Sequence, residues 1–122
     1  MSYKSPNYGE RSRLRPDRAE PSMIILHYTG MQSVEAALDR LCDPASEVSA
    51  HYVIEEDGST HQLVNDEHRA WHAGRSHWGG LTDINSASIG IEIVNKGHEF
   101  GYEDFPQVQI EAVTTLCNKL MK

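Results

Sequence analysis

The chain has 122 residues, a length typical of one domain, and 39% of them are hydrophobic, so a packed core is feasible. Its 11 Lys and Arg residues against 18 Asp and Glu residues give a net charge of −7, which argues against a general nucleic-acid binder because such proteins need a basic face. No apolar run has membrane-spanning length, and no hydrophobic signal segment is visible near the N-terminus.

The segment before the first apolar run is polar, contains three prolines and mixes arginines with acidic residues. This composition predicts an N-terminal extended arm over residues 1–22, either packed over the domain or loose, with its arginines in solvent. We expect the folded domain over residues 23–122. Cys42 and Cys117 fall in helix-like segments, and with no visible signal peptide we expect buried thiols rather than a disulfide.

Residues 23–28 form a short apolar run that ends at His27 and Tyr28, before Thr29-Gly30 breaks it. Such a run predicts a strand buried on both faces. The C-terminal ends of strands are where α/β sheets place their chemistry, so His27 is a candidate site residue. The alternative is a strand-end histidine that only hydrogen-bonds its neighbours.

The next two elements have clear local signals. Ser33 is suited to cap a helix whose apolar stripe includes Leu38 and Leu41, and Asp43-Pro44 ends that helix. Residues 49–64 then predict two strands joined by a turn at Asp57-Gly58. We expect His51 and His61, which flank this turn, to be surface or strand-edge histidines.

Residues 65–86 carry few aliphatic side chains but several histidines and two tryptophans, so we expect a functional loop rather than disorder. His68 and His72 have the spacing of a helical zinc motif. Arg69 stands where that motif needs a glutamate, however, and the surrounding residues are loop-like. We therefore do not expect a zinc-protease helix here.

Residues 88–95 alternate as a strand, with three isoleucines on one face and Gly90, Glu92 and Val94 on the other. If Glu92 lines a cleft, desolvation raises its pKa toward the range of a general base. The alternative is an exposed glutamate on an edge strand. A last helix spans residues 106–122, with these side chains on its buried side: Val108, Ala112, Val113, Leu116, Cys117 and Leu120. The order of elements predicts an α/β fold with a mixed central β-sheet flanked by helices.

Four motifs follow one another along the chain: MIILHYTG at 23–30, SAHYVIEEDG at 49–58, RAWHAG at 69–74 and SIGIEIVN at 88–95. Their order and gaps closely resemble the zinc-dependent N-acetylmuramoyl-L-alanine amidases, which share their fold with peptidoglycan recognition proteins. Four motifs in order are far more specific than any one of them. The resemblance implies hydrolysis of the amide bond between N-acetylmuramic acid and L-alanine in peptidoglycan or muropeptides, with Zn²⁺ as cofactor.

The resemblance also assigns roles to single positions. It implies that His27 is the first zinc ligand and that Glu92 is the catalytic glutamate. It further implies that Trp71 and His72 contact the substrate and that Asn85 helps to shape the same cleft. In such a site, zinc held by three protein ligands activates a water and polarises the carbonyl, and Glu92 takes the proton and passes it to the leaving amine.

The sequence departs from the family after the last predicted helix. The other two zinc ligands of the family, a histidine and then an aspartate or cysteine, belong to a segment that has no counterpart up to residue 122. We therefore expect a domain that lacks its C-terminal segment and a complete zinc site, and whose uncovered cleft favours self-association.

Three hypotheses follow: a zinc amidase, a non-catalytic muropeptide-binding module, or an unrelated structural domain. With no visible signal segment, we expect a cytoplasmic, bacterial protein of muropeptide recycling. The alternatives are a periplasmic protein whose leader has been removed and a phage-encoded protein.

Overall fold

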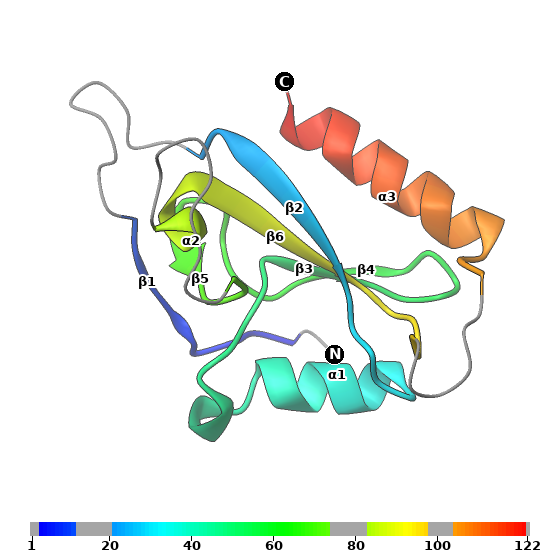
Figure 1. Cartoon of the computed structure of the whole chain (residues 1–122), viewed down its shortest axis with the longest axis horizontal. Coiled ribbons are helices and arrows are strands. Elements are labelled where there is room, and N and C mark those ends of the chain that lie inside the picture. Colours follow the sequence, from blue (N-terminus) through cyan, green and yellow to red (C-terminus); the bar gives the residue numbers. More distant parts are fainter. Residues whose placement is uncertain (1–2, 12–20, 74–82, 98–103, 122) are drawn as a thin grey trace.

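The computed structural model describes residues 3–11, 21–73, 83–97 and 104–121. Figure 1 shows a twisted sheet between two helices, α1 and α3. The elements follow the chain in this order: β1 (Tyr8–Glu10), β2 (Met23–Tyr28), α1 (Val34–Leu41), the 3-10 turn η1 (Pro44–Ser46), β3 (Tyr52–Ile54), β4 (Thr60–Gln62), β5 (His68–Ala70), α2 (Ile84–Ala87), β6 (Ser88–Ile93) and α3 (Gln107–Leu120).

The central sheet has the strand order β2-β6-β3-β4 among the described residues. β6 pairs in parallel with both β2 and β3, whereas β3 pairs antiparallel with β4. The predicted mixed sheet flanked by helices is therefore confirmed. Parallel neighbours on both sides and a helix on each face explain why β6 is buried along almost its whole length.

β2 lies at the edge of that sheet in the described part of the chain, so the prediction that it is buried on both faces is wrong. Leu26 is 50% exposed and Tyr28 is 55% exposed. An apolar run signals that a strand packs against a core, but it does not say how many strands pair with it.

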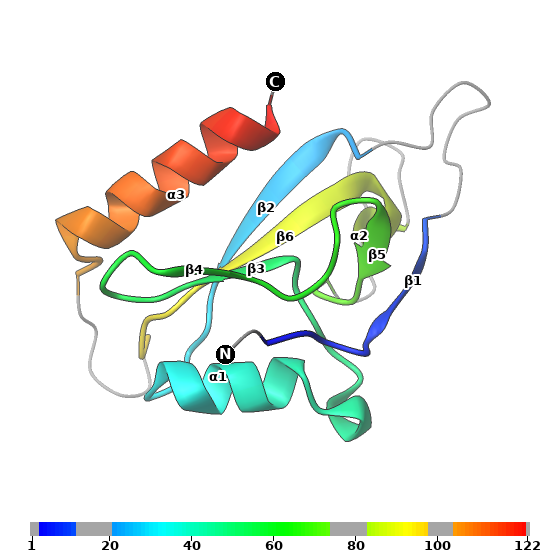
Figure 2. The same cartoon turned by 180° about the vertical axis from the view of Figure 1, so that it is seen from behind.

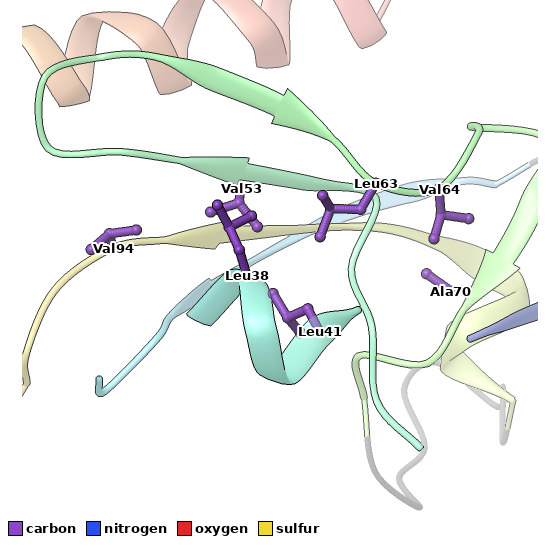
Figure 3. Close-up of a cluster of buried hydrophobic side chains, with 7 residues drawn as sticks. All are labelled: Leu38, Leu41, Val53, Leu63, Val64, Ala70 and Val94. Atoms are coloured by element: carbon purple, nitrogen blue, oxygen red, sulfur yellow. The ribbon is translucent and has the colours of Figure 1, made fainter. Parts of the chain in front are cut away.

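A separate apolar core fills each side of the sheet. Figure 3 shows the cluster under α1, in which leucines of the helix meet residues of the strands and loops: Leu38, Leu41, Val53, Leu63, Val64, Ala70 and Val94. The cluster under α3 contains Tyr52, Ile54, Ile89, Ile91, Ile93 and Leu116. The alternation predicted for residues 88–95 is thus confirmed, because the three isoleucines face α3 and Val94 belongs to the core under α1.

The predicted local signals of the first helix and of the hairpin are confirmed. The Ser33 side chain accepts a hydrogen bond from the N–H of Ala36, 3.1 Å away, at the start of α1. Asp43 accepts from the N–H of Ala45 at the start of η1, where α1 has ended. Gly58 has a φ of +91°, which a glycine adopts without strain, in the turn between β3 and β4.

α3 docks on the sheet through a side chain that the sequence analysis left out. Gln109 is fully buried, and its Nε2 donates to the carbonyl oxygens of Ile54 at 3.1 Å and Val94 at 3.0 Å. Val108, which was expected on the buried side, is 48% exposed. The first turn of the helix is anchored by polar bonds to the sheet, so its apolar stripe begins later, at Ala112.

The N-terminal residues 3–11 pack over the domain, and β1 pairs antiparallel with β5, as seen from behind in Figure 2. The guanidinium of Arg11 enters the fold, where it donates to the carbonyl oxygens of Asp66, Asn85, Ser86 and Ser88 at 2.8, 3.1, 3.0 and 2.9 Å. The expectation of a solvated arginine is therefore wrong for Arg11. The sequence shows that basic and acidic residues are interleaved in this segment. It does not show that the folded domain contains backbone carbonyl oxygens that need a hydrogen-bond donor.

Cys42 and Cys117 are free thiols, as predicted, and both are partly buried. Among the described residues, no helix combines the length and the apolar character that crossing a membrane requires.

Candidate functional site

The candidate site lies on the α1 side of the sheet, where β2 and β6 run side by side. His27 and Glu92 are register partners in this parallel pair, so both side chains leave the same face of the sheet. A cavity of about 170 Å³ opens next to them. Its lining combines the end of β6, the β2–α1 connection, α1, the loop before β3 and the segment after β5: Thr29, Met31, Ala37, Arg40, Leu41, Val48, Ser49, Trp71, His72 and Glu92.

Glu92 is the carboxylate of this cavity. Its Oε2 is buried and has no hydrogen-bond partner among the described residues. Burial raises the pKa of Glu92 to about 7, against a smaller lowering by the positive charge of Arg40. An unpaired carboxylate that changes protonation near neutral pH, at the wall of a cavity, is equipped to accept and return a proton.

Trp71 and His72 reach the cavity because the segment after β5 is fixed to the loop before β3. The backbone N–H of Trp71 donates to Ser49 Oγ, and the Trp71 carbonyl oxygen accepts from the N–H of Ser49, each at 2.9 Å. Residues 68–70 are a strand, so the expectation that no zinc-protease helix occurs here is confirmed.

Asn85, on α2, holds the same segment from the other side. Its Oδ1 accepts from the backbone N–H groups of His72 at 3.2 Å and Ala73 at 2.8 Å, and its Nδ2 donates to the Ala73 carbonyl oxygen at 3.2 Å. Asp83 caps α2 and binds Arg69 at 2.9 Å, which ties α2 to β5. The structure thus brings Asn85 to the backbone of the cavity wall.

His27 and His72 are joined directly, with Nε2 of His27 3.0 Å from Nδ1 of His72. The Nε2 atom of His72 lies 2.9 Å from Ser88 Oγ. Burial lowers the pKa of His27, and burial together with nearby positive groups lowers the pKa of His72 to about 3. Both imidazoles are therefore neutral at neutral pH, the form in which imidazole binds a metal ion.

His51, which was expected at the surface or at a strand edge, is fully buried. Its Nδ1 accepts from the Gly90 N–H at 3.1 Å, so its Nε2 carries the ring hydrogen and donates to the His68 carbonyl oxygen at 2.8 Å. The sequence did contain a signal, because His51 shares the alternation of Val53, which faces the core under α1. His61 is partly buried and binds Glu55 within the hairpin.

Five site residues were predicted from the sequence, His27, Trp71, His72, Asn85 and Glu92, and the structure gathers them around one cavity and its wall. Ser88, which binds the His72 ring, and Arg40, the cation of the cavity, were not predicted. Ser88 opens the motif at 88–95, but the motif gives no sign that its side chain binds a histidine, and Arg40 belongs to no motif. His77 and Trp78 of the histidine-rich stretch lie outside the described residues.

The described residues around His27 offer few ligands for a zinc ion. A catalytic zinc site uses three protein ligands. In the ranges that the structure describes, no group of three or more His, Cys, Asp or Glu side chains is arranged to hold a metal ion. Neutral His27 fits as one imidazole ligand, but the described residues do not complete the set.

Residues 17–122 match the sequence profile of a protein family described as N-acetylmuramoyl-L-alanine amidase. The chain is 32% identical over 127 residues to the 1,6-anhydro-N-acetylmuramyl-L-alanine amidase AmpD of Salmonella typhimurium, covering 90% of this chain and 65% of that protein. It is 32% identical over 111 residues to the N-acetylmuramoyl-L-alanine amidase AmiD of Escherichia coli, covering 81% of this chain and 39% of that protein. The chain thus spans less than two thirds of the length of these relatives.

A solved structure of Escherichia coli AmiD has the same fold. It superposes with a TM-score of 0.74 at 27% identity, over 94% of this chain and 51% of that one. That protein was solved with its substrate, anhydro-N-acetylmuramic acid carrying the peptide L-Ala-D-gamma-Glu-L-Lys. The predicted amidase-like α/β fold is therefore confirmed.

Proposed function

Because the chain belongs to the N-acetylmuramoyl-L-alanine amidase family, we propose that it acts on peptidoglycan or its muropeptide fragments. The reaction is hydrolysis of the amide bond between N-acetylmuramic acid and L-alanine. The observation that carries the proposal is Glu92, whose buried Oε2 has no partner among the described residues and whose pKa is raised to about 7.

Glu92 is the general base of this reaction. Its carboxylate takes a proton from the water that attacks the amide carbon, and it delivers that proton to the leaving amine nitrogen of L-alanine. A carboxyl group with a pKa near the working pH performs both transfers, because neither protonation state is strongly preferred. The wall position of Glu92 in the cavity supports this role.

The groove for the substrate is assigned to Trp71, His72 and Asn85. Trp71 offers an apolar face on which a sugar ring or peptide packs. Trp71 and His72 line the cavity that contains Glu92, and Asn85 fixes the backbone that presents them. The muropeptide held by the related AmiD supports this substrate class.

His27 is assigned as one ligand of a zinc ion. When bound in such a site, zinc lowers the pKa of a coordinated water and polarises the scissile carbonyl. Within the described ranges the donor set stays incomplete, so the steps assigned above are those of this chain's own side chains.

The incomplete donor set is also the observation that favours a second function, a non-catalytic module that binds muropeptides. Such a module needs the groove of Trp71 and Asn85 but neither zinc nor a base. The two functions differ in one measurable way, because the module binds the muropeptide and returns it unchanged.

The test uses the protein expressed from its complete gene, with zinc supplied and with anhydro-N-acetylmuramyl peptide as substrate. Release of the free peptide is followed by chromatography, and binding is followed by calorimetry. We expect turnover that is lost in Glu92→Gln while binding is kept. Glu111→Gln, a change at an exposed glutamate of α3, is the matched control. Binding without turnover in the unaltered protein favours the module, and full activity of Glu92→Gln rejects Glu92 as the base.

A further inference from the structure

A chain of hydrogen bonds runs from the backbone of α2 to His27, and the hydrogen of each bond can be assigned. Ser88 Oγ lies 2.7 Å from the carbonyl oxygen of Ile84. A carbonyl oxygen only accepts, so the Ser88 hydroxyl donates its single hydrogen there. The contact of Ser88 Oγ with His72 Nε2 at 2.9 Å is then a bond that the serine accepts, and the hydrogen belongs to Nε2 of His72.

This assignment fixes the other nitrogen of His72. A neutral imidazole carries one ring hydrogen, so Nδ1 of His72 presents a lone pair. At a pH well above the ordinary pKa of imidazole the ring is neutral. Nδ1 of His72 lies 3.0 Å from Nε2 of His27, and two lone pairs do not face each other at hydrogen-bond distance. The hydrogen between the rings therefore belongs to Nε2 of His27.

We propose that His72 is a positioning residue, which holds His27 in the tautomer protonated at Nε2 and leaves Nδ1 of His27 as the nitrogen that binds a metal ion. The role of Nδ1 as the metal-binding nitrogen rests on the proposed function, whereas the tautomer of His27 does not. Fixing the tautomer and the ring orientation of a ligand histidine through its other nitrogen is the usual work of a neighbouring hydrogen-bond partner.

His72 is itself fixed from three sides, as such a partner needs to be. Its ring packs against Gly90, its backbone N–H donates to Asn85 Oδ1 at 3.2 Å, and its Nε2 donates to Ser88. With both ring nitrogens bound inside the protein, His72 has no free hydrogen to offer a substrate oxygen. Its part in the groove is then to form the wall and to hold His27, rather than to donate to the muropeptide.

The experiment is nitrogen-15 NMR of the metal-free protein with labelled histidines, at roughly pH 8, where an imidazole is neutral. We expect His27 and His72 both protonated at Nε2, with a scalar coupling across the hydrogen bond between His27 Nε2 and His72 Nδ1. Protonation of His27 at Nδ1, or absence of that coupling, overturns the proposal.

Three variants separate positioning from packing. His72→Phe removes the acceptor and should leave His27 as a mixture of tautomers with faster exchange of its Nε2 hydrogen. His72→Asn places a carbonyl oxygen near the position of Nδ1 and should restore the single tautomer. Ser88→Ala removes the acceptor that holds the hydrogen on His72 Nε2, and it should therefore abolish the coupling between the rings. His61→Phe, a change at a hairpin histidine that binds Glu55, should leave His27 unchanged.

The outcomes remain separable. If His72→Phe does not fold, the coupling in the unaltered protein and the effect of Ser88→Ala decide the question. An unchanged His27 in Ser88→Ala and His72→Phe overturns the inference. The NMR experiment uses neither metal nor substrate, so its failure leaves the amidase proposal standing. If His27 has the expected tautomer but the protein shows no turnover, only the amidase proposal is rejected.

Discussion

Gly90 of β6 leaves the space that the imidazole ring of His72 fills. A Cβ atom added at Gly90 would lie 2.4 Å from Cγ and 2.7 Å from Nδ1 of that ring, far inside van der Waals contact. The absence of a side chain in the central strand is therefore what lets a residue of the β5–α2 segment sit over the sheet beside His27.

Gly90→Ala is expected to displace the His72 ring and to lower the free energy of unfolding by about 1–3 kcal/mol, the usual cost of overpacking. Urea unfolding measures the loss, and the ring resonances of His72 report the displacement. Gly9→Ala is the matched control, because its added Cβ would have no atom within 4 Å. Equal stability of the two variants would contradict the close packing of His72 on the sheet.

Glu92 makes stability depend on pH. The pKa of Glu92 rises from 4.5 to about 7 on folding. Below pH 4.5 the carboxyl group is protonated in both the folded and the unfolded state, so it does not change the free energy of unfolding. As pH rises toward 7, the unfolded chain releases the proton first and stability falls. Above pH 7 the buried carboxylate lowers the free energy of unfolding by its full amount, at most roughly 3 kcal/mol.

Glu92→Gln removes this cost. We expect the variant to unfold at a higher urea concentration than the unaltered protein at pH 8, with a much smaller gain at pH 5. Denaturant titrations at the two pH values measure the difference, and Glu111→Gln, in an exposed position, should show none. A gain that is the same at both pH values would reject the raised pKa.

Arg11 ties the N-terminal segment to the backbone that presents Asn85 and Ser88. Its Nη1 alone donates to the carbonyl oxygens of Asn85, Ser86 and Ser88. Arg11→Met keeps the apolar stem but leaves these carbonyls without that donor, so a loss of about 2–4 kcal/mol is expected. Lys4→Met removes one exposed bond to the Gln62 carbonyl and should cost less than about 0.5 kcal/mol. Thermal unfolding of both variants makes the comparison, and equal midpoints would show that the buried guanidinium contributes nothing.

Gln109 fixes α3 to the sheet through the carbonyl oxygens of Ile54 and Val94. Gln109→Leu keeps the volume but removes both bonds, and we expect it to destabilise the fold by about 1–3 kcal/mol. Ile110→Ala, at a neighbouring position that is 45% exposed, should have a small effect. Amide hydrogen exchange along α3 should accelerate only in the first variant. Faster exchange in both would mean that apolar contacts, not Gln109, hold the helix.

The sequence by itself determined the features that depend on neighbours along the chain. The cap at Ser33, the turn at Gly58 and the alternation of β6 follow from local backbone chemistry and from the period of the apolar residues, and all three occur in the structure. The four motifs were enough to predict the fold and the family, because their order along the chain is itself a sequence property.

Only the tertiary structure decided which partners meet across long separations. It placed β2 at the sheet edge and buried His51, and it placed Gln109 rather than Val108 between α3 and the sheet. It also set His27 against His72, 45 positions away. Strand order, buried hydrogen bonds and ring contacts depend on which donor finds which acceptor in space. A periodic pattern marks the face of each element but does not identify its partner.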